Sequence, residues 1–138
     1  MDNVDRQSVS DAWSEAAQDA LNAARELKER AHYRSSVSRA YYAAYAFLAA
    51  AMVAKPGVSF ADGRDGPQHG SLPDLVKSHL AGDLGRRILW NVRTSITALY
   101  EARLVADYRP RVFVNRDVAT DALRRAGAIA NAVKRDSP

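Results

Sequence analysis

The sequence predicts an all-α fold, an antiparallel bundle of four long helices and one short helix. Apolar residues recur every three or four positions along four long segments, which is the spacing of one helix face. Alanine supplies much of the 47% hydrophobic content and favours closely packed helices over a sheet. No segment alternates apolar and polar residues over the length of a strand. We therefore expect one domain over residues 1–138 with a single core.

The first two predicted helices carry the clearest apolar faces. The first runs from Ser8 or Ser10 to about Arg30, with one stripe formed by Trp13, Ala17, Ala20, Ala24, Leu27 and Ala31. The second covers about 33–55 and ends before Pro56-Gly57. One of its faces carries Val37, Tyr41, Tyr45, Leu48 and Met52, and the opposite face is largely alanine. A helix that is apolar nearly all round is central in the bundle, or a partner chain covers its second side.

Residues 55–70 form a loop with four glycines and two prolines, longer than the usual connection in a compact bundle. Such a loop is either functional or mobile. The sequence Ser-Leu-Pro-Asp at 71–74 then reads as a helix start with proline in the first turn. It predicts a short helix through Leu80 that ends near Gly82.

Two more long helices complete the bundle. One is predicted from about Asp83 to Ala106, and Arg-Pro-Arg at 109–111 breaks the chain after it. The last is predicted over 117–134, with Val118, Ala122, Ala126, Ile129 and Val133 on its core side.

Composition places the chain among intracellular proteins. It contains no cysteine, so we expect a reducing compartment and a cytoplasmic location. The polar, acidic start at residues 1–5 does not resemble a signal peptide. The longest apolar run, 40–54, holds three tyrosines and is too short to span a bilayer, so we expect no membrane association.

The formal net charge of +4 is unevenly distributed. Residues 1–69 carry 8 Lys/Arg and 9 Asp/Glu, whereas residues 70–138 carry 12 and 7. Arginine outnumbers lysine, which suits bidentate contacts with phosphate. The basic second half is compatible with a phosphate-facing patch or simply with a solvated surface.

The apolar stripe of the predicted helix at 83–106 ends in a charged group. Ile88, Val92, Ile96 and Leu99 lead to Arg103, and Asp107 follows four residues later, with Tyr108 next to it. This spacing fits an intrahelical salt bridge that finishes the helix, or a functional arginine at the end of the core.

The second helix also contains a charged residue, Arg39, between apolar positions. It is either a buried partner for a carboxylate, for which Asp107 is the first choice, or a residue that lines a cleft. Tyr42 and its neighbouring tyrosines fit core aromatics with a hydroxyl at the bundle edge, or a platform for a nucleic-acid base.

Two motifs carry a family resemblance. Ser-Arg-Ala-Tyr-Tyr-Ala at 38–43 and Arg-x-x-x-Asp-Tyr at 103–108 resemble the signature of HEPN-type helical-bundle proteins, in helix order over nearly the whole chain. The resemblance implies a homodimer that belongs to a prokaryotic toxin–antitoxin or defence system. It also implies a cognate antitoxin partner, frequently a minimal nucleotidyltransferase.

The resemblance suggests site residues as well. Many HEPN domains are metal-independent ribonucleases with an R-x(4–6)-H motif, in which histidine transfers a proton and arginine stabilises phosphate charge. Arg103 matches the arginine, but Asp107 and Tyr108 occupy the histidine positions, and no histidine follows His79. His69, at the start of the short helix, is the candidate replacement; a local hydrogen-bonding role in the loop is its alternative. The candidate catalytic residues are therefore Arg103, Asp107 and His69.

The candidate RNA- or nucleotide-binding residues are Arg39, Tyr42, Tyr108 and Arg109. The three histidines lack ligand-like spacing, so we expect no metal and no cofactor. Two functions stay open. The first is an RNA-directed HEPN protein that acts as a metal-independent ribonuclease. The second is a non-catalytic dimeric scaffold that binds a partner protein, such as a nucleotidyltransferase, or a nucleotide.

Overall fold

The computed structural model describes residues 2–60, 64 and 66–134 of the chain. Its five α-helices are α1 (Asn3–Glu29), α2 (Tyr33–Val53), α3 (Leu72–Leu84), α4 (Arg86–Tyr108) and α5 (Arg116–Lys134), and a 3-10 turn, η2 (His69–Ser71), precedes α3. The described residues include no strand, and the prediction of an all-α bundle is confirmed.

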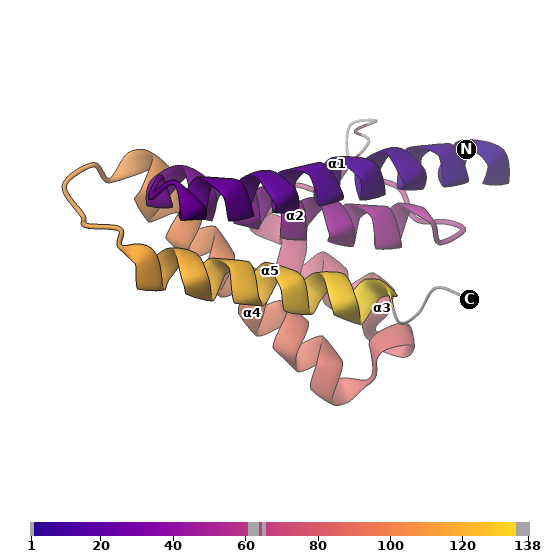
Figure 1. The fold of residues 1–138 in the computed structure, drawn as a ribbon. Coiled ribbons are helices and arrows are strands. Elements are labelled where there is room, and N and C mark those ends of the chain that lie inside the picture. Colours follow the sequence, from indigo (N-terminus) through magenta and orange to yellow (C-terminus); the bar gives the residue numbers. More distant parts are fainter. Residues whose placement is uncertain (1, 61–63, 65, 135–138) are drawn as a thin grey trace.

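The helices pack around α2, which contacts each of the other four. Figure 1 shows α1 and α2 as an antiparallel hairpin, with α5 beside them and α4 crossing at an angle. The short α3 lies near the start of α4, away from the end where α4 leads into α5 (Figure 1). Within the described residues, no helix combines the length and the apolar character that a membrane span requires.

The central position of α2 accounts for its apolar character all round. Leu48 and Met52 are fully buried, and so are Ala40 and Ala43 on its alanine-rich side. Small side chains let neighbouring helices approach closely, and both α1 and α5 pack against α2. The alanine-rich side is therefore covered within one chain at Ala40 and Ala43, as expected of a helix that is central in the bundle.

Several helix ends differ from the predicted ones. α1 begins at Asn3, because the Asp2 side chain accepts a hydrogen bond from the Asp5 backbone N–H at 2.8 Å and caps the helix. α3 continues past Gly82 and ends at Gly85, whose φ of 77° favours glycine. α4 consequently begins at Arg86 and continues to Tyr108.

Arg6 of α1 lies beside the C-terminus of α2 and binds the start of the long loop. The Arg6 guanidinium donates to the carbonyl oxygens of Lys55 and Val58 at 2.9 and 3.0 Å, and to that of Val53 at 3.4 Å. The Val53 carbonyl belongs to the last residue of α2 and the other two follow the helix, where a cation is favourable near the helix C-terminus. Arg6 thus fixes the direction in which the loop leaves the bundle.

The far end of the same loop lies against the aromatic side of the bundle. Gly66 and Pro67 are buried, and the Tyr45 hydroxyl donates to the Pro67 carbonyl at 2.5 Å. A Cβ atom at Gly66 would lie 2.7 Å from the Trp13 ring and 2.8 Å from the Tyr45 hydroxyl. The close approach that glycine permits here brings His69 next to α2.

Candidate functional site

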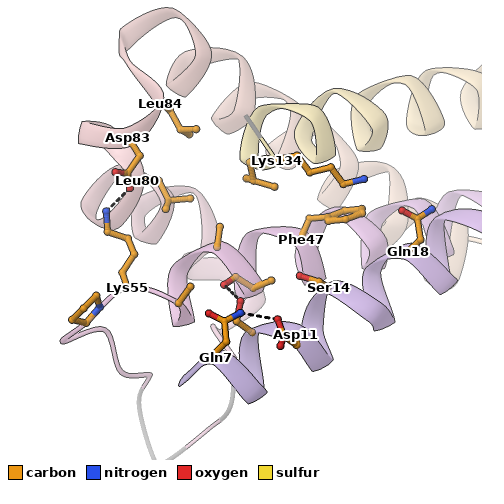
Figure 2. A pocket seen from close by; sticks show the side chains of 16 residues that line it. Gln7, Asp11, Ser14, Gln18, Phe47, Lys55, Leu80, Asp83, Leu84 and Lys134 are labelled. Carbon is orange, nitrogen blue, oxygen red and sulfur yellow. Dashed lines mark hydrogen bonds and ion pairs between the residues drawn. The ribbon is translucent and has the colours of Figure 1, made fainter. Parts of the chain in front are cut away.

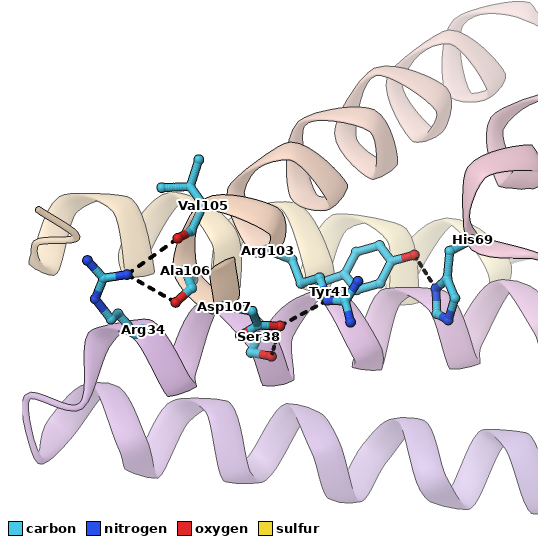
Figure 3. Close-up of polar contacts among 8 residues, drawn as sticks. All are labelled: Arg34, Ser38, Tyr41, His69, Arg103, Val105, Ala106 and Asp107. Carbon is cyan, nitrogen blue, oxygen red and sulfur yellow. Dashed lines mark hydrogen bonds and ion pairs between the residues drawn. The ribbon is translucent and has the colours of Figure 1, made fainter. Parts of the chain in front are cut away.

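One face of α2 forms the seam with α4 and with the end of the long loop. Arg34, Ser38, Tyr41 and Tyr45 recur with helical spacing along it, and each side chain contacts one of those two segments. Figure 3 shows the first three reaching across to Ala106, Asp107 and His69. Polar side chains of α2 therefore lie along this seam, next to the apolar core.

Arg103 and Asp107 form an ion pair on this seam. Nε of Arg103 lies 3.0 Å from Oδ2 of Asp107, and the Ser38 hydroxyl donates to the same oxygen at 3.1 Å. The two charged side chains are 26% and 29% exposed, so the pair is half-buried. The pair itself is intrahelical, as the salt-bridge interpretation of this spacing expects, and the Ser38 hydroxyl connects it to α2.

His69 lies on the other side of Tyr41. Its Nδ1 is 2.6 Å from the Tyr41 hydroxyl, and its ring stacks on Tyr45 with 4.4 Å between ring centroids. The Arg103 guanidinium carbon lies 5.9 Å from the centroid of the same Tyr41 ring. One tyrosine therefore contacts both the histidine and the arginine that the sequence analysis selected (Figure 3).

Burial and charge set the protonation states of this group. Burial raises the pKa of Tyr41 well above its usual range, although nearby Arg103 acts in the opposite direction. Partial desolvation of the His69 ring, which packs on Tyr45 although the residue as a whole is exposed, and the positive charge of Arg103 lower the pKa of His69 below its ordinary value of 6.5. At neutral pH the Tyr41 hydroxyl keeps its proton and the His69 ring is uncharged.

Six of the seven residues selected from the sequence belong to one continuous set of contacts. Arg39 lies 4.9 Å from the centre of the Tyr42 ring, which stacks on Tyr45 at 6.1 Å between centroids. Tyr45 leads to His69 and Tyr41, and Arg103 lies 5.5 Å from the Tyr108 ring. We call this set the arginine–aromatic cluster: Arg39, Tyr41, Tyr42, Tyr45, His69, Arg103, Asp107 and Tyr108. Arg109 is exposed and contributes no side chain to it.

The expected pairing of Arg39 with Asp107 is wrong. Arg39 is exposed and lies over Tyr42, whereas its neighbour Ser38 makes the contact with Asp107. Consecutive helical residues point about 100° apart, so only one of the two can share the face of Tyr41. Ser38 and Tyr41 are three positions apart and lie on that face.

Sequence reasoning missed the roles of Arg34 and Ser38. The Arg34 guanidinium donates to the carbonyls of Val105 and Ala106 at 3.3 and 3.0 Å, at the end of α4 (Figure 3). One sequence signal could have found these roles. Residues 34, 38 and 41 have the spacing of one helix face, and all three carry polar groups.

A separate hollow of about 700 Å³ lies between α1, α2, α3 and α5 (Figure 2). Lys55 and Asp83 form an ion pair at its edge, and the Lys134 ammonium lies 5.4 Å from the Phe47 ring. None of the residues selected from the sequence lines this hollow, and it shares no residue with the arginine–aromatic cluster. In the described ranges, no three His, Asp or Glu side chains group as metal ligands.

The protein is an all-α bundle whose candidate site lies between α2 and α4 and contains an arginine and a histidine. The chain belongs to the HEPN domain family, whose model matches residues 10–136. This match confirms the resemblance drawn from the motifs at 38–43 and 103–108. No curated protein matches the chain in sequence.

Proposed function

We propose that the protein is the RNA-directed HEPN component of a prokaryotic toxin–antitoxin or defence system, and that it cleaves RNA without a metal ion in the cytoplasm. The observation that carries this proposal is the contact of one residue, Tyr41, with both His69 and Arg103. Proton transfer and phosphate stabilisation are the two tasks of metal-independent RNA cleavage, and the two side chains supply one each.

His69 is suited to the proton transfer. Its pKa lies below its ordinary value, so the ring is neutral and able to accept the proton of a ribose 2′-OH. The 2′ oxygen then bonds to the adjacent phosphorus, the bond to the 5′ oxygen breaks, and a 2′,3′-cyclic phosphate forms. The protonated imidazole returns its proton to the leaving 5′ oxygen. The proposed step uses the tautomer in which Nδ1–H donates to the Tyr41 oxygen, so that Nε2 carries the free lone pair and accepts the 2′-OH proton.

Arg103 retains the donors needed to bind a phosphate. Only its Nε is used in the ion pair with Asp107, and neither Nη group has a hydrogen-bond partner among the described residues. The four N–H groups on these two nitrogens are a fork that matches phosphate oxygens. In this proposal Asp107 orients the guanidinium, and the salt bridge and the catalytic role are compatible.

The remaining members of the cluster supply binding. Arg39 lies over the Tyr42 ring and Arg103 lies over the Tyr108 ring, so the cluster offers a substrate two pairs of a cation and an aromatic ring. A cation beside an aromatic ring suits a base stacked on the ring with its phosphate on the cation.

The test is cleavage of single-stranded RNA in EDTA. We expect Arg103→Ala to abolish cleavage and His69→Ala to slow it by about 10²–10⁴-fold. The matched controls are Arg25→Ala and His32→Ala, which change exposed residues outside the cluster and outside the proposed dimer face, and should retain activity. Cleavage that survives Arg103→Ala would exclude the assignment.

A second candidate is a non-catalytic dimeric scaffold that binds a partner protein, such as a nucleotidyltransferase, or a nucleotide. The observation that favours it is the Arg103–Asp107–Ser38 contact, which joins two helices. In that case wild type cleaves no RNA, and Arg103→Ala lowers the melting temperature because Asp107 loses its partner. Thermal melts of the variants beside the cleavage assay separate the two candidates.

We also propose that the protein is a homodimer that associates through the outer face of α4. Trp90 is 67% exposed there, with Arg86 and Arg87 one turn before it. Tryptophan and arginine are the side chains enriched at the energetic centres of interfaces. Sedimentation should show a dimer that dissociates in Trp90→Ala; a wild type that is monomeric at tens of micromolar would refute the proposal.

A further inference from the structure

The connection between α4 and α5 has the composition of a nucleic-acid contact. Residues 108–116 include three arginines, a tyrosine and a phenylalanine, and no acidic residue. Phe113 is 83% exposed, and Tyr108 and Val112 are 66% and 43% exposed. Exposed aromatic side chains at this density are unusual on a protein surface and mark an interaction site.

Hydrogen bonds hold the backbone of this connection in a position that leaves these side chains exposed. Arg34 donates to the carbonyls of Arg109 and Pro110 at 3.2 Å each, and also to that of Val112. Val114 is buried, and Asn115 accepts a hydrogen bond from the Val118 backbone N–H that caps α5. The loop is therefore tied to the bundle through its carbonyls, while Phe113 is displayed to solvent.

The loop is continuous with the arginine–aromatic cluster. The ring of Tyr108, the last residue of α4, has its centroid 5.5 Å from the guanidinium carbon of Arg103, and the loop begins at the next residue. Figure 1 shows the connection extending beyond the end of the bundle where α4 meets the α1–α2 hairpin. A chain molecule bound at Arg103 that continues past Tyr108 reaches this loop next.

We infer that residues 108–113 bind single-stranded RNA beside the nucleotides held at Arg103 and His69. In this inference Phe113 stacks on an unpaired base, and Arg109 and Arg111 contact the backbone phosphates. It rests on the proposed RNA-directed function and adds a second contact region to it. An exposed ring can stack only on a base that is free of a duplex, which selects single strands.

Charge favours RNA over a protein as the occupant. Within the part of the chain that the structure describes, Arg109, Arg111 and Arg116 form no ion pair. A run of three arginines without a carboxylate matches a polyanion, which offers one phosphate per nucleotide.

The test measures binding of a fluorescent 2′-O-methyl oligonucleotide of about 12 nucleotides by anisotropy; this probe lacks the nucleophile for cleavage and spans a typical single-strand site. We expect Phe113→Ala to raise the Kd by about 5- to 100-fold, which is the range for loss of one stacked base. We expect Arg111→Ala to reduce the slope of log K against log salt by about 0.7.

The controls are Val4→Ala and Lys77→Ala, which change an exposed apolar residue at the start of α1 and an exposed cation of α3, both outside the cluster, the loop and the proposed dimer face. Neither should change the affinity. Because Phe113 is 83% exposed, its replacement should leave the melting temperature unchanged. A duplex RNA of the same length should bind wild type and Phe113→Ala equally.

Equal affinity of wild type and Phe113→Ala for the single strand would overturn the inference. If Phe113→Ala instead weakens self-association in sedimentation, the loop is a protein interface and the inference fails. Cleavage that needs Arg103 and His69 but not Phe113 would remove this inference alone. RNA binding that needs Phe113, with no cleavage by wild type, would remove the ribonuclease proposal alone.

Discussion

The Tyr41 hydroxyl and Nδ1 of His69 lie 2.6 Å apart and join the central helix to the segment that follows the long loop. Tyr41 is 2% exposed, whereas His69 is exposed, so the bond runs from the core to the surface. It holds the imidazole against Tyr45 and beside Arg103.

Tyr41→Phe removes the hydroxyl and keeps the ring. We expect a loss of about 1 kcal/mol in the free energy of unfolding, because one hydrogen bond is lost and the Nδ1 atom of His69 turns to solvent. Urea unfolding measures it. Tyr42→Phe is the matched control, since no hydrogen bond of the Tyr42 hydroxyl occurs among the described residues. Equal losses in both variants would contradict the role assigned to the bond.

The lowered pKa of His69 predicts a pH dependence of stability. In the unfolded chain His69 takes up a proton near pH 6.5, whereas the folded protein does so only at lower pH. The unfolded state thus binds more protons in this window, and stability falls as the pH drops through 6.5 toward the folded pKa. Urea unfolding over a pH series should show a weaker decline for His69→Gln than for wild type. An unchanged decline would refute the shift, and His32→Gln serves as the exposed control.

Arg34→Met should destabilise the end of α4. The guanidinium binds the carbonyls of Val105 and Ala106 in the last turn of α4, where Val105 also accepts from the Arg109 backbone N–H at 3.0 Å, and its removal should cost about 1–3 kcal/mol. Denaturant unfolding gives the total loss. Hydrogen exchange should report faster opening in the last turn of α4 than in α1. Arg30→Met alters a nearby exposed arginine and should have little effect; a comparable loss there would show that charge alone matters.

Gly66→Ala should destabilise the protein by about 1–3 kcal/mol, because the added Cβ meets the Trp13 ring at 2.7 Å and the Tyr45 hydroxyl at 2.8 Å. Gly70 offers the matched control, since a Cβ there meets nothing within 4 Å. Gly70→Ala should lie within about 0.5 kcal/mol of wild type. Thermal and urea unfolding compare the two. A neutral Gly66→Ala would show that the loop moves away from the aromatic rings without cost.

Apolar spacing was sufficient to predict the helices, because core burial alone explains stripes such as Val92, Ile96 and Leu99. It was insufficient for the helix ends, which depend on local groups. The Asp2 cap extends α1 toward its N-terminus, and the positive φ of Gly85 separates α3 from α4 three residues after Gly82. Gly82 itself sits within α3, where nothing in the sequence distinguishes it from a terminating glycine.

The candidate site was predictable only in part. The four-residue spacing of Arg103 and Asp107 is local, and the structure contains their contact. Which residue of α2 meets Asp107 depends on how two helices are rotated against each other, and the rotation favours Ser38 over Arg39. The contact between Tyr41 and His69 depends on the path of the loop, which Gly66 and Arg6 direct through contacts distant in sequence.

The position of Tyr41 between His69 and Arg103 has a consequence for protein synthesis. A ribosome extends the chain from its N-terminus, so α2 emerges well before Arg103, which lies 62 positions after Tyr41. Until α4 has been made and has docked, the imidazole has no guanidinium beside it. A nascent chain therefore lacks the complete site throughout most of its translation. The cleavage proposed for the finished protein would then not act on the messenger and ribosomal RNA nearest to the growing chain.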